Sequence, residues 1–321
     1  MSGIAGRDIA IVAFVELPPV SRDTEREEVE LVQPVVSEAL ARAGLERRDV
    51  GFVCSGSCDY LLGRPFSFVA ALDGVAPWPP ILESHVEMDG AWALYEAWVR
   101  LLCGDVDTAL VYAYGKSSLG DLPRVLAQQL DPYTLAPLGV DADAIAGLQA
   151  RALCDAGRAT ERDVAKVAEG RRVSDGAAAV VLAAGATAER LAKRPAWIRG
   201  IDHRIEPHQL GARDLTRSSS TRLAAEHAGA FARRPDVAFL HAGFPHEEII
   251  LRDALAIDDA VTRVPSPRAD PMIVAGLTRI GHAAATVLDG GADRALAHAT
   301  SGPCLQQNLV CVLDASREAT S

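Results

Sequence analysis

The feature that most constrains the fold is a regular alternation of apolar, strand-like runs with amphipathic helical stretches. The pattern predicts buried strands over residues 8–17 and 107–115, a turn that runs into a strand over 174–185, and helices over residues 26–45 and 91–104. Strands that alternate with helices of this length are typical of α/β proteins, in which helices cover the faces of a sheet. We therefore predict an α/β fold.

The alternation starts again in the second part of the chain. Strands are predicted over residues 197–205 and 236–244, helices over 214–229 and 246–257, and a strand, turn and strand over 295–314. A turn and a helix are predicted where the chain reads GLTRIGHAAATVLDGG, at residues 276–291. The length of 321 residues also suits two domains.

Two short segments echo each other across this division. ERRDVGFVCSG at residues 46–56 and ARRPDVAFLHAG at 232–243 share a basic pair, an Asp-Val step, an apolar pair and a small-residue turn. The echo favours two copies of one βαβ-rich unit, with chance similarity as the alternative. We expect a first half over 1–185 and a second over 186–321.

Composition excludes several classes of protein. A net charge of −11 disfavours nucleic-acid binding, because an acidic surface repels a phosphate backbone. The sequence has no uninterrupted apolar run long enough for a membrane span, and its start lacks the basic residues of a signal peptide. The six cysteines do not form two pairs at zinc-binding spacing. We expect a cytoplasmic protein without a structural metal.

A set of motifs occurs in one order along the chain. DGAWAL starts a helix at residues 89–94, SDGAAA occupies 174–179, HAGF occupies 241–244, Gly281-His282 follows, and SGPCLQQN contains Cys304. In this order the chain resembles the thiolase superfamily, in particular its sterol-carrier or lipid-transfer-protein type. The resemblance implies two similar halves in a five-layer α-β-α-β-α arrangement, with a reduced cover region at about 116–171.

The resemblance also implies a pocket between the halves, lined by Glu87, His241, His282 and Cys304. In the family, the two matching histidines form an oxyanion site for the thioester carbonyl, and the matching cysteine is the base at the α-carbon. The alternative is that the histidines are ordinary turn residues and that Cys304 is a buried apolar residue. The family's Gly-His-Pro is altered here, since Ala283 follows His282.

Glu87 stands where the nucleophilic cysteine of working thiolases stands, three residues before Gly90. A helix N-terminus favours a thiolate and a carboxylate alike, but a carboxylate is a poor thioester nucleophile whose acyl product is a labile anhydride. Glu87 is therefore either an acid-base group in the vacated pocket or a helix-end carboxylate. Asp89 is expected to cap the helix.

These features predict cleavage of a C–C bond in a β-hydroxyacyl-CoA by a retro-aldol reaction, without a covalent cysteine intermediate. Such a reaction needs an enolate stabiliser and a base. One alternative is a degenerate subunit that binds acyl-CoA beside an active partner; another is an acyltransferase or thiolase that uses a different cysteine, such as Cys54. The substrate is expected to be a lipid or sterol-derived acyl-CoA.

No tightly bound cofactor is expected, and coenzyme A enters only as part of the substrate. The resemblance implies a homodimer, or a heteromer with a thiolase or a small OB-fold acyl-CoA-binding protein.

Overall fold

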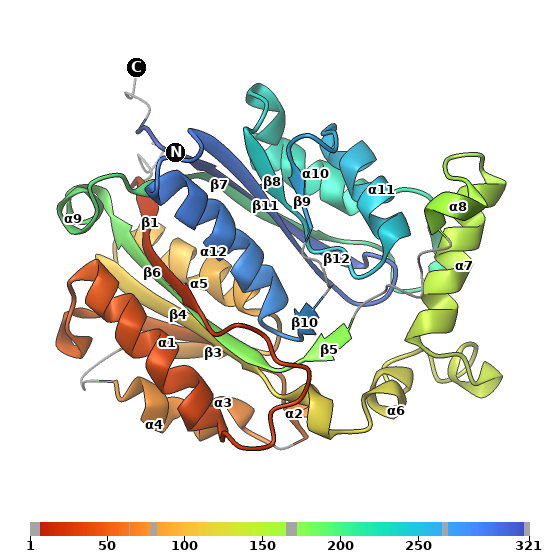
Figure 1. Ribbon diagram of the computed structural model, residues 1–321, viewed down its shortest axis with the longest axis horizontal. Coiled ribbons are helices and arrows are strands. Elements are labelled where there is room, and N and C mark those ends of the chain that lie inside the picture. Colours follow the sequence, from red (N-terminus) through yellow and green to blue (C-terminus); the bar gives the residue numbers. More distant parts are fainter. Residues whose placement is uncertain (1–6, 64, 78–81, 165–171, 265–268, 318–321) are drawn as a thin grey trace.

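The computed structural model describes residues 7–63, 65–77, 82–164, 172–264 and 269–317. Its ten-stranded sheet consists of two five-stranded halves (Figure 1). In the first half the strand order is β3-β2-β4-β6-β1. These strands are β1 (Ile9–Glu16), β2 (Phe52–Gly56), β3 (Leu82–Val86), β4 (Thr108–Gly115) and β6 (Gly176–Ala184).

The second half repeats this topology, in the order β7-β12-β11-β8-β9. Its strands are β7 (Ala196–Ile205), β8 (Val237–Phe239), β9 (Thr262–Arg263), β11 (Arg294–Ser301) and β12 (Gln307–Asp314). The halves join where β1 pairs with β7 through Ala10 and Ile11. The two echoing segments lead into β2 and β8, which occupy equivalent places in the two halves.

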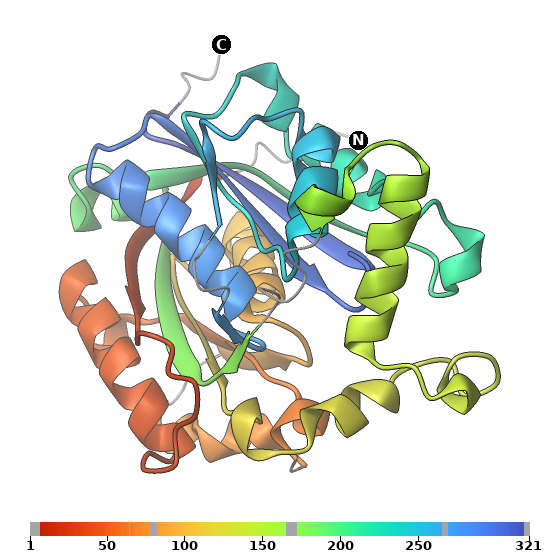
Figure 2. The ribbon, with the colours of Figure 1, turned by 45° about the vertical axis from the view of Figure 1, so that its right-hand side comes forward.

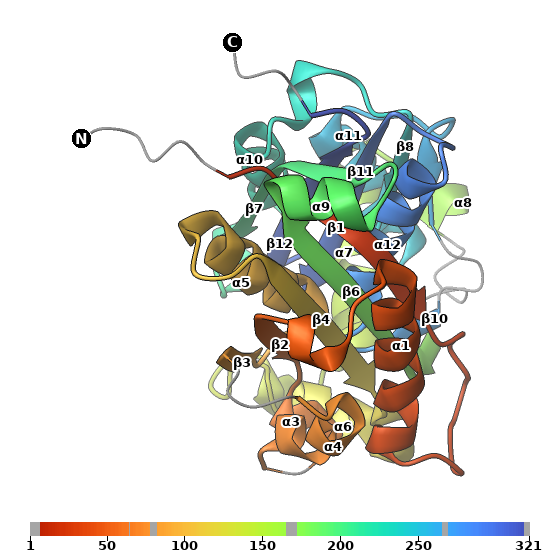
Figure 3. The same cartoon turned by 90° about the vertical axis from the view of Figure 1, so that its left-hand side faces the viewer.

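Helices form three layers that alternate with the two halves of the sheet (Figures 1 and 3). Helix α1 (Glu28–Ala43) covers the outer face of the first half, and α10 (Ser219–His227) with α11 (Pro245–Leu255) covers that of the second. Helices α5 (Gly90–Cys103) and α12 (Ala275–Leu288) pack together between the halves. The predicted α/β class and α-β-α-β-α layering are confirmed.

The composition of each helix fits its layer. Helix α1 is amphipathic and buries one stripe against the sheet. Helices α5 and α12 are apolar around most of their circumference, as a helix covered on both sides must be. Small residues bring the two central helices close, since a Cβ on Gly90 would lie 2.9 Å from a Leu277 methyl carbon.

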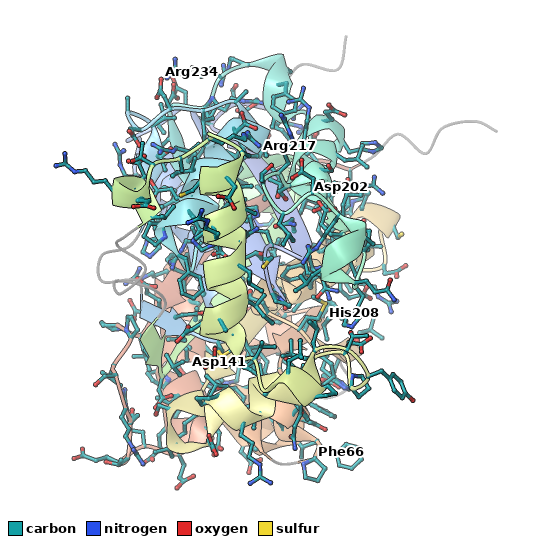
Figure 4. The ribbon with its side chains drawn as sticks, turned by 90° about the vertical axis from the view of Figure 1, so that its right-hand side faces the viewer. Phe66, Asp141, Asp202, His208, Arg217 and Arg234 are labelled. Atoms are coloured by element: carbon teal, nitrogen blue, oxygen red, sulfur yellow. The ribbon has the colours of Figure 1, made fainter. Side chains whose placement is uncertain are left out.

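The predicted cover region crosses from the first half to the second. It contains α6 (Leu122–Ala127), α7 (Ala142–Asp155) and α8 (Glu161–Val164), while its residues 165–171 lie outside the described residues. Helix α7 runs beside the second half (Figures 2 and 4), and Asp141 caps its start. Arg158 joins the cover region to α11 through an ion pair with Asp253 at 2.7 Å.

The remaining described helices are short. They are α2 (Asp59–Leu62), α3 (Ser67–Ala70), α4 (Leu72–Val75) and α9 (Gly185–Leu191). Helix α9 packs on β1 and β6 of the first half, so the strand pattern of the second half begins only at β7. The division at residue 186 stays a prediction. Within the described ranges, no helix has the length and apolar character to cross a membrane.

The SDG motif, predicted as a turn, is extended: Ser174 ends β5 (Arg172–Ser174), which pairs with β10 (Ala269–Pro271), and Gly176 begins β6. Asp175 is fully buried, and its Oδ2 accepts hydrogen bonds from the backbone N–H of Asp23 and the hydroxyl of Ser118. Asp175 thus connects the segments that contain Asp23 and Ser118 to the start of β6.

Candidate functional site

The candidate site lies where several strands end and the two central helices begin. Strands β2, β3 and β4 are parallel, so their carboxyl ends meet at one edge of the sheet. Helix α5 begins at this edge at Gly90, and α12 begins beside it at Ala275. Ligand sites of open α/β sheets form outside the carboxyl ends of such strands.

Asp89 connects the starts of both central helices. Its Oδ1 accepts hydrogen bonds from the backbone N–H of Ala91 at 2.8 Å and of Leu277 at 2.9 Å. Its Oδ2 accepts one from the N–H of Gly276 at 2.8 Å. The predicted N-cap of α5 therefore also serves α12, which is 187 residues away along the chain.

The environment of Asp89 is largely dry, since the residue is 6% exposed. Burial raises the pKa of its carboxyl from 3.8 to about 6. The charge of His241 and the backbone N–H bonds act in the opposite direction, and the nearby Asp270 adds to the rise. The carboxyl thus titrates close to neutral pH, which is unusual for an aspartate.

His241 and Asp270 lie beside Asp89. The imidazole Nε2 of His241 is 3.7 Å from Oδ1 of Asp270, and both side chains are largely buried. The backbone N–H of Thr300 donates to Nδ1 of His241 at 3.4 Å. In the neutral ring this bond leaves the proton on Nε2, facing Asp270. The site thus brings one predicted residue, His241, together with two buried carboxyl groups.

The segment between Asp270 and α12 is strained. Ile273 has a φ of +78°, which is unfavourable for a β-branched residue. Its carbonyl accepts a hydrogen bond from the N–H of Gly90 at 2.7 Å, so the strained turn is fastened to the start of α5. Strain of this kind persists only where the surrounding structure holds it, and it concentrates at functional sites.

The side chain of Glu87 is exposed and reaches the start of α2. It follows β3, and its Oε2 accepts a hydrogen bond from the backbone N–H of Asp59 at 3.0 Å, at the start of α2. Glu87 thus meets the start of the short helix α2, whereas the sequence pattern places it at the start of α5.

His282 lies inside α12, not in a turn before it, and the predicted turn at the start of 276–291 is therefore wrong. It is six residues beyond Gly276, or about 9 Å along the helix axis. Its Nε2 pairs with Oε1 of Glu16 at 3.0 Å, and its ring packs on Phe14 and Phe239. The structure therefore places His282 in a different set of contacts from Asp89.

Cys304 lies in a turn after β11 and faces the cover region. It is 6% exposed, and its Sγ donates weakly to the carbonyl of Ile145 in α7 at 3.7 Å. Burial raises the pKa of the thiol to about 12, so the thiolate is scarce at neutral pH. These surroundings match those of a buried apolar residue.

Sequence reasoning missed Asp270, which directly precedes the segment PMIVAG at residues 271–276. The signal that could have found it is the Asp-Pro pair shortly before a helix. No group of His, Cys, Asp and Glu side chains suited to a metal ion is found among the described residues.

Comparison with known proteins identifies the fold. No family model and no curated protein matches the sequence. Human mitochondrial 3-ketoacyl-CoA thiolase, in a complex with CoA, superposes with a TM-score of 0.73 at 14% identity, over 97% of this chain and 98% of that one. The acetyl-CoA acetyltransferase of Bacillus anthracis gives 0.72 at 14% identity, over 98% and 100%. The chain has the thiolase fold.

Proposed function

We propose that this chain is a thiolase-like acyl-CoA-binding protein that does not carry out thiolysis. The observation that carries the proposal is the carboxylate of Asp89 at the start of α5. A helix N-terminus is where an acyl-accepting thiolate would be stabilised, and here the Asp89 carboxylate already accepts the N–H of Ala91 at the start of α5. The link to acyl-CoA rests on the fold, because the human thiolase of this fold binds CoA.

The cysteines support this proposal. Thiolysis requires a thiolate that attacks the thioester carbonyl. Burial raises the pKa of both Cys304 and Cys54 to about 12, and Cys54 is enclosed within β2. An acyltransferase that uses either thiol is therefore disfavoured.

We infer that the protein pairs through β3, the edge strand of the first half. Leu82, Glu83 and His85 are exposed there. If a second copy added its β3 in antiparallel fashion about Ser84, each Glu83 would oppose a His85. Exchange of charge tests this: Glu83→Lys should weaken the dimer in light scattering, and adding His85→Glu should restore it. A monomer at all concentrations would contradict the pairing.

Retro-aldol cleavage of a β-hydroxyacyl-CoA is the second candidate, and the pairing of His241 with Asp270 favours it. The carboxylate of Asp270, which faces the Nε2–H of His241, can take the proton of the β-hydroxyl, whereupon the C–C bond breaks to a carbonyl product and an enolate. The enolate oxygen then needs hydrogen-bond donors. The N–H groups of Ala91, Gly276 and Leu277 are already bonded to Asp89, which argues against this candidate.

Calorimetric titration tests the proposed function. We expect acetyl-CoA and a longer β-hydroxyacyl-CoA to bind, with CoA itself as a competitor. His241→Ala serves as the matched variant. We expect loss of the imidazole to leave binding of the CoA moiety intact, because His241 is proposed to face the acyl end of the ligand. Absence of binding to all three ligands at millimolar concentration would contradict the proposal.

A further inference from the structure

We propose that the buried guanidinium of Arg279 binds a carboxylate at the far end of the acyl chain, so that the ligand is the CoA ester of a dicarboxylic acid. The inference rests on the proposed function, because it names the acyl group that the same site takes. Arg279 lies in α12 and is 6% exposed. Among the described residues its guanidinium makes one hydrogen bond, from Nη1 to Oγ1 of Thr278 at 3.1 Å, and its Nε is buried without a partner.

The charge of Arg279 has no close counter-ion, since the guanidinium forms no ion pair within the described part of the chain. Burial lowers its pKa, and the charges of Asp270 and Glu16 oppose this shift from a distance. Asp270 faces the imidazole of His241 at 3.7 Å, and Glu16 pairs with that of His282 at 3.0 Å. Buried charges are normally paired, so the guanidinium is suited to an anion from outside the chain.

The position of Arg279 places it at the candidate site. It lies three residues beyond Gly276, or about 4.5 Å along the helix axis, and Gly276 donates its N–H to Asp89. Helical side chains lean toward the helix N-terminus, so the guanidinium points back to the turn between Asp270 and α12. The bond to Thr278 agrees with this direction, because the hydroxyl of Thr278 itself bonds back to the first residue of α12.

A carboxylate on the acyl chain is the anion that fits this place. A guanidinium binds a carboxylate through two parallel N–H bonds, and the site lies on the side of His241 that is proposed to face the acyl group. The phosphate groups of CoA are bulkier and carry more charge, so they would lose more hydration at a group that is 6% exposed. The guanidinium thus selects for the acyl end of the ligand.

Calorimetric titration with matched CoA esters tests the inference. Glutaryl-CoA and pentanoyl-CoA have chains of equal length, and only the first ends in a carboxylate. Succinyl-CoA with butanoyl-CoA, and adipoyl-CoA with hexanoyl-CoA, cover a shorter and a longer chain. We expect the natural protein to bind at least one dicarboxylic ester about tenfold more tightly than its counterpart.

Arg279→Met, which keeps the length of the side chain and removes its charge, should abolish that preference. Arg222→Met is the matched control, because Arg222 is exposed on α10 at the outer face of the second half, and this variant should keep the preference. If Arg279→Met does not fold, Arg279→Lys takes its place. Lysine keeps the charge but lacks the planar fork, so the preference should fall.

Equal affinities within every pair of esters would overturn the inference, as would a preference that the Arg279 variant retains. Equal weakening of both members of a pair by Arg279→Met would also overturn it, because the guanidinium would then serve the CoA moiety or the fold. Absence of binding by all these esters would contradict the proposed function itself, so the two failures are distinguishable.

Discussion

Replacement of Asp89 by asparagine should change how the stability of the protein depends on pH. The folded pKa of Asp89 is about 6, against 3.8 for an unperturbed carboxyl. A raised pKa means that the folded state holds its proton more tightly than the unfolded state. The free energy of unfolding contributed by this group is therefore greatest below pH 4, and it falls as pH rises from about 4 to about 6.

The magnitude follows from the size of the shift. A rise of two pKa units corresponds to about 3 kcal/mol, of which about 2 kcal/mol is lost between pH 4.5 and 7.5. Urea unfolding followed by circular dichroism would measure this at several pH values in the natural protein and in Asp89→Asn. Because other titrating groups are common to both, the difference between the two curves isolates Asp89.

We expect the natural protein to lose stability relative to Asp89→Asn as pH rises through this window. Parallel curves would refute the reasoning, because they would mean that burial does not shift the carboxyl. A relative gain in stability would show that the three backbone N–H bonds outweigh desolvation and lower the pKa of Asp89.

Three further predictions concern other parts of the structure. Arg294→Met should cost about 1.5–3 kcal/mol in urea unfolding, because it removes the Nη1 group that donates to both oxygens of buried Asp314 at 3.0 and 2.8 Å and leaves that carboxylate only Arg233 at 3.3 Å; a cost below about 1 kcal/mol would contradict this. Gly276→Ala should cost about 1–3 kcal/mol, since the new methyl group meets the carboxylate of Asp89 and the side chain of Ala299; the Asp89→Gly background should relieve only the part of that cost due to Asp89. Peptide mapping after iodoacetamide treatment of the folded protein should find exposed Cys103 alkylated and buried Cys304 unmodified; equal modification would contradict the burial of Cys304.

The fold was predictable because its determinants are local. Apolar periodicity marks the buried strands, and Asp89 and Gly104 mark the two ends of α5. The echo of the two segments that lead into β2 and β8 coincides with a strand order that the two halves share. Each signal lies within a short window, so it could be identified without knowledge of tertiary contacts.

The site was less predictable, because its determinants are distant in sequence. Helix α12 begins near Ala275 because Asp89, from another half of the protein, caps it, and no local residue signals this start. The turn that the sequence predicts at the start of residues 276–291 therefore lies within the helix. Gly281 is there for packing, since a Cβ would lie 2.2 Å from the ring of Phe14.

The grouping of Glu87, His241, His282 and Cys304 depended on the same kind of distant information. Order along the chain cannot tell which way a side chain points after a strand ends. Glu87 turns towards α2, and Cys304 turns towards α7 of the cover region. Only His241 lies beside the buried carboxyl groups of Asp89 and Asp270.

The most direct test of the central claim is product analysis by mass spectrometry. The purified protein, alone and with an intact thiolase or OB-fold partner, would be incubated with a β-ketoacyl-CoA plus free CoA, and separately with a β-hydroxyacyl-CoA. We predict that the protein alone binds these esters and gives no thiolysis product, and that Glu87→Ala behaves identically. Formation of a chain-shortened acyl-CoA from the keto ester and CoA by the protein alone would contradict the account.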